Sequence, residues 1–152
     1  MIDLQDFYRI IISGLLGTAA MTLVMYAYSM ITGINTKVVH ILGNMLTASS
    51  PEISTDTKSL VTGSIAHIGV GMLFSFSYYL MLDWDWLDRE WSDSFWTGLI
   101  SGILAIIVWK TYIYLHKRPP LLSLPHYQMA LILSHIVFGM VTILSFSLIP
   151  SA

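Results

Sequence analysis

Cysteine is absent from this chain of 152 residues, and charged residues are scarce. Without cysteine there is no disulfide, thiolate metal site, iron–sulfur cluster or cysteine nucleophile. Charged residues make up 11% of the sequence, whereas an ordinary soluble domain carries about 25%. That is too few to cover a soluble fold. The net charge of −2 also provides no basic surface for nucleic acid, so we expect no nucleic-acid partner.

Long apolar segments take the place of the missing charge. Crossing the hydrocarbon core of a bilayer takes about 20 helical residues, and four segments are long enough: residues 10–32, 60–82, 94–115 and 127–149. The only charged residue inside them is Lys110. Backbone groups in lipid must be bonded within their own segment, which favours helices. We predict an all-α integral membrane protein, a four-transmembrane-helix bundle forming one domain over residues 1–152.

The three connections between these segments differ in character. Residues 38–46 of the first interleave apolar and polar side chains, which predicts a short interfacial helix. The second, residues 83–93, is acidic and rich in tryptophan, as at a membrane–water boundary. The first and third connections hold more Lys and Arg than the opposite side, which predicts that they face the cytoplasm. The residues compared are Lys37, Lys58, Lys117 and Arg118 against Arg9 and Arg89.

A short motif recurs in the second and fourth segments. Residues 66–72 read AHIGVGM and residues 134–140 read SHIVFGM, so His, Ile, Gly and Met match at an offset of 68. This repetition predicts two related helical hairpins, with halves at residues 10–82 and 94–149. Hairpins inserted in the same sense are related by a pseudo-twofold axis along the membrane normal.

The repeat places polar residues at one depth. His67 and His135 lie seven and eight residues into their segments, on the order of 11 Å below the same boundary at about 1.5 Å per residue. Lys110 and Tyr26, near the ends of the third and first segments, reach a similar depth. Ionisable groups inside a span are costly unless paired or hydrated. We therefore predict a ligand-binding layer of Tyr26, His67, Lys110 and His135.

Three functions are compatible with this layer. The first is binding of a ligand or cofactor: a b-type haem between the histidines, a metal held by His67 and His135, or a small anion beside Lys110. A metal normally needs roughly three or four ligands, and no carboxylate lies in any span. The second is an accessory or assembly subunit with a structural histidine pair. The third is a small transporter or proton-conducting protein. No enzyme motif is present, so we predict no catalytic residue.

Glycines near the histidines predict close helix packing. Gly71 and Gly139 each follow a histidine by one turn, and Gly98 and Gly102 form a Gly-x-x-x-Gly pair on the third segment. Such faces let another helix approach, whether from the same chain, a second copy or another membrane protein. The remaining histidines are predicted to be interfacial: His40, His116 and His126.

Three of these patterns together carry a resemblance. The opening GLLGTAAMT at residues 14–22, His67-x-x-x-Gly71 and His135-x-x-x-Gly139 resemble small bacterial four-helix membrane proteins of unknown function, including relatives of the YagU type. The resemblance covers nearly the whole chain and implies a bacterial inner (cytoplasmic) membrane location. It implies no activity, and Lys110 is not part of its pattern.

Overall fold

The computed structural model describes residues 3–47 and 52–149, and the regular structure in these ranges is helical. The helices are α1 (Leu4–Thr32), α2 (Val38–Thr47), α3 (Thr57–Asp83), α4 (Trp91–Leu115) and α5 (Leu124–Leu148). Four of them are long and apolar enough to cross a membrane. The prediction of four candidate spans, with a short helix between the first two, is confirmed.

Each of the four long helices begins before its apolar segment, and at α1 and α3 a polar side chain caps the start. The Asp3 side chain accepts a hydrogen bond from the Asp6 backbone N–H, and Asp6 bonds back to the Asp3 backbone. The Asp56 side chain accepts from the Ser59 N–H at 2.9 Å, so α3 starts at Thr57. Such caps satisfy backbone donors that the first helical turn leaves free. Hydropathy marks where lipid begins, whereas the caps mark where the helix begins.

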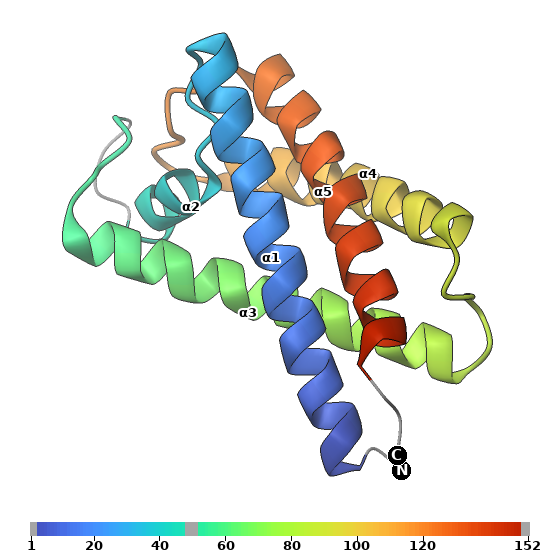
Figure 1. Ribbon diagram of the computed structural model, residues 1–152. Coiled ribbons are helices and arrows are strands. Elements are labelled where there is room, and N and C mark those ends of the chain that lie inside the picture. Colours follow the sequence, from blue (N-terminus) through green and yellow to red (C-terminus); the bar gives the residue numbers. More distant parts are fainter. Residues whose placement is uncertain (1–2, 48–51, 150–152) are drawn as a thin grey trace.

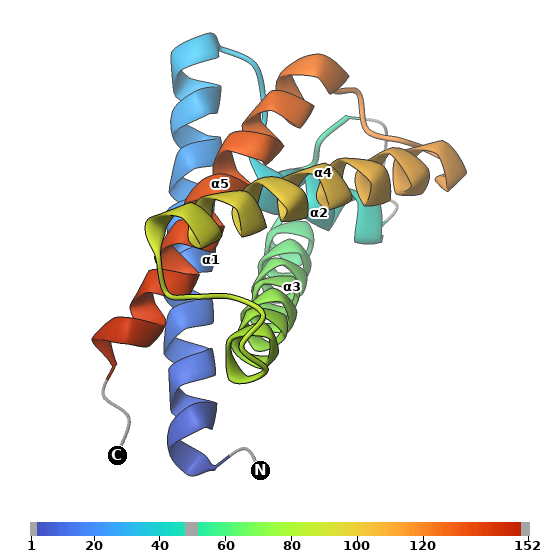
Figure 2. The ribbon, with the colours of Figure 1, turned by 90° about the vertical axis from the view of Figure 1, so that its right-hand side faces the viewer.

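The long helices form an incomplete ring in sequence order. α1 packs on α3 and α5, and α4 packs on α5. The backbones of α3 and α4 have no close contact within the described ranges, and a buried hydrogen bond between the Tyr78 hydroxyl of α3 and Ser101 Oγ of α4, at 2.7 Å, connects them. Figure 1 shows α1 and α5 running beside each other across α3 and α4, and Figure 2 shows the same helices from the side. α2 packs on α3. Between α3 and α4, which follow each other in the chain, the ring is therefore closed by side chains at Tyr78 and Ser101 and not by backbone packing.

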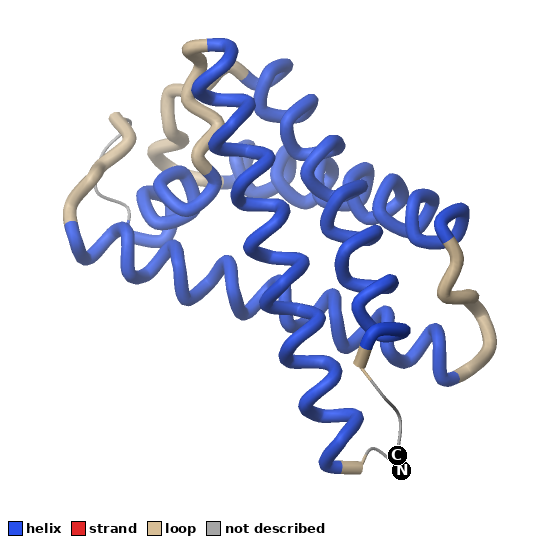
Figure 3. Tube along the Cα trace, viewed as in Figure 1, coloured by secondary structure: helices blue, strands red, loops and turns tan. Residues whose placement is uncertain are grey.

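Successive long helices run in opposite directions, so the connections gather at two ends. In Figure 3 the described parts of the first and third connections lie toward the upper left, and the second connection lies toward the lower right. The end of α1 and the start of α5 share the first of these ends. Basic connections therefore lie together, away from the acidic, tryptophan-rich one.

Glycine allows a close backbone contact between α4 and α5. A Cβ atom on Gly139 would lie 2.7 Å from the Gly98 Cα atom, and one on Gly98 would lie 2.6 Å from the His135 carbonyl oxygen. Both neighbours are backbone, which cannot rotate out of the way. α4 and α5 thus approach at a distance that no larger residue permits. Gly102 lies along the same contact, and Gly71 instead faces Thr18 of α1.

A buried arginine closes the opposite end of the molecule. Arg9 of α1 donates from Nη2 to the Phe146 carbonyl oxygen in the last turn of α5, at 2.7 Å. The residue four positions on is Pro150, which has no N–H to offer that carbonyl. Asp6 lies 3.7 Å from Arg9 Nη1 and pairs with it. Arg9 is therefore part of the packed helix pair and is only 6% exposed.

Candidate functional site

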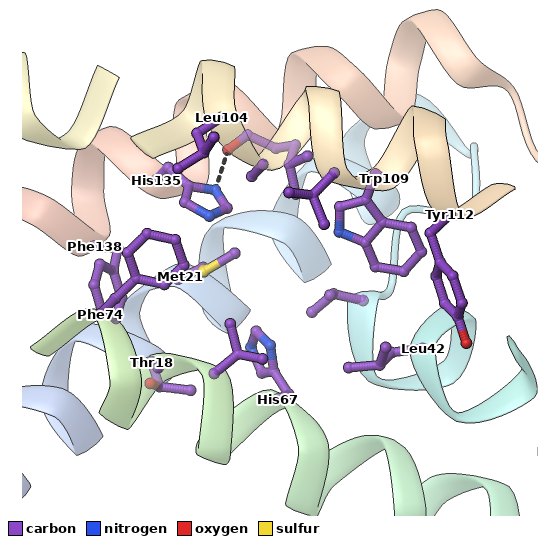
Figure 4. Close-up of a pocket in the computed structure, with 16 residues that line it drawn as sticks. Thr18, Met21, Leu42, His67, Phe74, Leu104, Trp109, Tyr112, His135 and Phe138 are labelled. Carbon is purple, nitrogen blue, oxygen red and sulfur yellow. Dashed lines mark hydrogen bonds between the residues drawn. The ribbon is translucent and has the colours of Figure 1, made fainter. Parts of the chain in front are cut away.

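A cavity of about 210 Å³ lies beside the gap between the backbones of α3 and α4, and all five helices contribute to its walls. Figure 4 shows its lining side chains, which are mostly aliphatic or aromatic. Among them are both predicted histidines, His67 from α3 and His135 from α5. The two imidazole rings lie on different walls with the cavity between them. No carboxylate or cationic lysine or arginine lines this cavity.

The His135 ring is oriented by its own helix. Its Nδ1 atom lies 2.8 Å from the Leu131 carbonyl oxygen, one turn earlier in α5. A carbonyl can only accept, so Nδ1 carries the hydrogen and the neutral ring has its lone pair on Nε2. The edge of Phe74 packs against the ring at a centroid distance of 6.0 Å. His135 thus presents a hydrogen-bond acceptor in a cavity whose walls are mostly aliphatic or aromatic.

The His67 ring is oriented by the neighbouring helix α1. Its Nε2 atom lies 3.0 Å from the Thr22 hydroxyl oxygen. That hydroxyl gives its single hydrogen to the Thr18 carbonyl oxygen at 2.7 Å. The histidine Nε2 must therefore donate to Thr22, which leaves the lone pair of the neutral ring on Nδ1. His67 links α3 to α1, whereas the bond of His135 stays within α5.

The cavity opens sideways between α3 and α4. Three apolar residues line it and yet are about half exposed: Val70 of α3 at 48%, and Leu104 and Val108 of α4 at 50% and 58%. They lie on α3 and α4, whose backbones have no close contact and which the Tyr78–Ser101 hydrogen bond joins elsewhere along their length. In a membrane-spanning bundle such an opening faces the lipid chains. Molecules dissolved in the bilayer could enter here without passing through water.

The other two predicted site residues lie outside the cavity. The Tyr26 hydroxyl and His40 Nδ1 form a hydrogen bond at 3.1 Å, and the centre of the Tyr26 ring is 5.8 Å from Lys37 Nζ. It therefore joins α1 to α2. Lys110 is exposed on α4 and is not among the lining residues. The structure brings the two histidines together and places Tyr26 and Lys110 elsewhere.

Sequence reasoning missed several lining residues, including Phe74, Trp109 and Phe138. The edge of Trp109 packs on Tyr127 at 5.1 Å, and Phe74 packs on Phe138 at 6.1 Å. An aromatic residue in an apolar span looks the same in sequence whether it faces lipid or a neighbouring helix. No signal in a single sequence distinguishes the two positions.

Neither a haem nor a metal ion fits this arrangement well. Pockets for drug-sized ligands measure roughly 300–1,000 Å³, so a cavity of about 210 Å³ suits a ligand smaller than haem. The walls offer two ring nitrogen acceptors, and no group of three or more His, Cys, Asp or Glu residues in the described ranges is placed to hold a metal. These two acceptors therefore suit hydrogen bonding to a small molecule that carries a donor.

The three remaining histidines lie at the end of the bundle that holds the basic connections. His40 bonds to Tyr26, and His126 Nδ1 bonds to the Tyr28 hydroxyl at 3.0 Å. His116 Nε2 lies 3.0 Å from the Met45 carbonyl oxygen. Burial, with the Lys37 charge nearby, lowers the pKa of His40 below its usual value. Each of these histidines joins two elements and none lines the cavity.

Comparison with known proteins places the chain in a family. The model of a family of unknown function, DUF6789, matches residues 4–151. No curated protein and no solved structure matches the chain. The chain therefore belongs to the DUF6789 family, and the predicted class of four-helix membrane protein of unknown function is confirmed. The relation to the YagU type and the bacterial setting stay predictions.

Proposed function

We propose that this DUF6789 protein binds a small lipophilic molecule that carries a hydroxyl group and enters from the bilayer. The observation that carries the proposal is the pair of imidazoles, His67 and His135, in one apolar cavity open between α3 and α4. Each ring has one nitrogen bonded to the protein, so its second nitrogen is available as an acceptor. A hydroxyl group supplies the matching donor.

The surrounding lipid makes these acceptors decisive for selectivity. Lipid chains are as apolar as the cavity walls, so moving an apolar ligand from lipid into the cavity gains little hydrophobic free energy. A hydrogen bond contributes about 0.5–1.5 kcal/mol net, and an unsatisfied polar group in an apolar site costs more. A ligand that donates to His67 or His135 is therefore preferred over a hydrocarbon of the same shape.

Cavity size limits the ligand. An apolar cavity of about 150 Å³ in another protein accommodates benzene, and this one measures about 210 Å³. It can hold a single ring or part of an alkyl chain beside the histidines. Because the opening is lateral, the remainder of a longer ligand can extend between α3 and α4 into the lipid. Alcohols and phenols with an alkyl chain fit these requirements.

A hydrogen bond that links two helices is present at one of the two cavity histidines. The bond from His67 to Thr22 crosses from α3 to α1 and stabilises that contact. The hydrogen bond of His135 returns to its own helix, and its contact with α3 is ring packing against Phe74. A purely structural pair, as in an accessory or assembly subunit, accounts for that packing but not for the unbonded Nε2 of His135. That role and a transport or proton-conducting role stay predictions.

We also propose that the two hairpins arose by duplication. Gly71 packs against Thr18, and Gly139 packs against Gly98. In each case a glycine one turn after the cavity histidine contacts the first long helix of its own hairpin. These parallel placements support the halves at residues 10–82 and 94–149.

The proposed orientation in a bacterial inner membrane gains support from Arg9. Its guanidinium is buried and bonded to α5, so it does not act as a free loop charge. On that side of the membrane Arg89 is then the remaining basic residue. The first and third connections keep four basic residues, which supports a cytoplasmic position for them.

Histidine NMR with a matched pair of probes tests the proposed function. The protein in detergent micelles, labelled with ¹⁵N in its imidazole rings, is titrated with decan-1-ol and with decyl methyl ether, which lacks a donor. We expect decan-1-ol to shift the His135 Nε2 and His67 Nδ1 signals, while the ether leaves them in place. His126, which lies outside the cavity, reports non-specific effects. Equal shifts with both probes, or none with either, would contradict hydroxyl binding.

A further inference from the structure

A second hollow, of about 470 Å³, lies at the end of α4, beside the cavity. Its lining residues are Tyr112, Leu115, His116, Lys117 and Arg118. Tyr112 lines both spaces, so they are adjacent. A row of aromatic rings along α4 connects them, with Trp109 to Tyr112 at 6.4 Å and Tyr112 to His116 at 5.8 Å between centroids.

The two basic residues of this hollow, Lys117 and Arg118, lie on a turn that hydrogen bonds of His116 fix. His116 Nδ1 accepts from the Arg118 backbone N–H at 3.2 Å, and its Nε2 donates to the Met45 carbonyl oxygen at 3.0 Å. Both ring nitrogens of His116 are thus used in fixing the turn. The side chains of Lys117 and Arg118 are exposed. They form no ion pair within residues 3–47 and 52–149.

The surroundings of the hollow change from apolar to basic along the chain. Tyr114 and Leu115 are 87% and 71% exposed on the last turn of α4, which suits contact with lipid chains. Lys117 and Arg118 follow directly, just past the end of the span. Basic residues immediately beside a membrane span attract anionic lipid head groups. An arginine and a lysine together bind a phosphate group through charge-assisted hydrogen bonds.

We propose that this hollow binds an anionic phospholipid, with its phosphate against Lys117 and Arg118 and its acyl chains along Leu115 and the exposed face of α4. This second site goes beyond the ligand cavity and does not depend on it. The adjacency through Tyr112 places the lipid beside the lateral opening. A lipid phosphate is favoured over a free one because the cations adjoin exposed apolar residues of a span.

Lipid retention tests this proposal. Protein in nanodiscs of equimolar phosphatidylglycerol and phosphatidylcholine is extracted into mild detergent, and the retained lipids are counted by mass spectrometry. We expect phosphatidylglycerol to be enriched on the unaltered protein. Lys117→Gln with Arg118→Gln should reduce that enrichment about tenfold or more, since each basic residue near an anionic surface contributes about 1 kcal/mol. Lys58→Gln with Arg89→Gln removes the same charge elsewhere and should leave the enrichment in place.

Further experiments test whether positive charge is sufficient, whether the bound phosphate belongs to a lipid, and whether the two sites are independent. The double variant Lys117→Arg, Arg118→Lys keeps both positive charges and should retain the phosphatidylglycerol enrichment of the unaltered protein. Excess inorganic phosphate should not displace phosphatidylglycerol, and full displacement would assign the hollow to free phosphate and overturn the lipid proposal. Equal enrichment in both Gln pairs would also overturn it. The decan-1-ol shifts at His135 should persist in the Lys117→Gln, Arg118→Gln variant, so the outcomes at the two sites are distinguishable.

Discussion

Helix α4 meets its two neighbours in the ring in opposite ways. Toward α5 it presents glycine, and the Gly98–Gly139 contact brings the backbones together. Toward α3 it bonds through Ser101 to the Tyr78 hydroxyl, and at Leu104 and Val108 the two helices leave a lateral opening. Helices in lipid gain little hydrophobic free energy from association, so small residues decide which faces close. The closed face holds the bundle together, and the open face is where a ligand can enter.

The closed contact between α4 and α5 is sensitive to added volume at Gly139. Gly139→Ala places a Cβ atom 2.7 Å from the Gly98 Cα atom and 2.8 Å from the Ser94 carbonyl oxygen. The helices must move apart, and overpacking of this kind costs about 1–3 kcal/mol. We expect the free energy of unfolding in mixed micelles to fall by that amount.

The matched control is Gly69→Ala on α3. A Cβ atom on Gly69 has no other heavy atom within 4 Å. The free energy of unfolding should stay the same or rise by up to about 1 kcal/mol, because alanine favours the helix. If both alanine variants lose equal stability, close glycine packing is not what holds α4 to α5.

Substitution of each histidine separates binding from stability. His67→Leu removes the bond between α3 and α1 and should lower the free energy of unfolding by about 1 kcal/mol. His135→Leu removes a bond within α5 and should change it far less. Both should weaken decan-1-ol binding about fivefold, as the loss of one hydrogen bond predicts, measured by NMR titration. A loss of stability without a loss of binding in either variant would favour the structural role.

Blocking the opening should affect binding alone. Val108→Trp adds bulk at the rim of the cavity, where the residue is 58% exposed. We expect decan-1-ol binding to weaken several-fold with little change in unfolding. Ile107→Trp is the control, since Ile107 is 56% exposed on the same helix and does not line the cavity. Entry by another route would be indicated if the two variants bind equally well.

The smallest expected effect is a pH dependence at His40. Burial and Lys37 lower the pKa of His40 in the folded protein below its usual value of 6.5. As the pH falls below about 6.5, the unfolded chain binds a proton more readily than the folded one, so stability decreases. Above that pH, His40 does not make the free energy of unfolding depend on pH. Unfolding measured between pH 8 and 5 should show this decrease, and the decrease should be smaller in His40→Gln. An unchanged slope in His40→Gln would assign it to another group.

Much of the fold follows from the sequence because span length is a physical requirement. The four apolar segments could be predicted from bilayer thickness, and the meeting of His67 and His135 from their equal depth on the second and fourth spans. The helix start was predicted least well at α1, because the Asp3 cap lets that helix begin at Leu4, before the apolar segment that starts at residue 10.

Depth alone did not predict which side of a helix faces inward. Lys110 and Tyr26 share the depth of the histidines but lie outside the cavity. The spans are apolar on all sides, so the sequence pattern does not distinguish a lipid-facing side from a packed one. The Thr22 bond that orients His67 depends on how α1 is rotated against α3. That rotation is set by packing between helices and not by either segment alone.

Contact quenching at Trp109 tests hydroxyl recognition in the cavity most directly. Trp109 lines the cavity, and the other four tryptophans can be replaced by phenylalanine: Trp84, Trp86, Trp91 and Trp96. Bromodecanol should then quench the fluorescence of Trp109 at lower concentration than its brominated methyl ether. The difference should vanish in the His67→Leu, His135→Leu double variant. Equal quenching by the two probes in the protein with both histidines would contradict a hydroxyl-binding cavity.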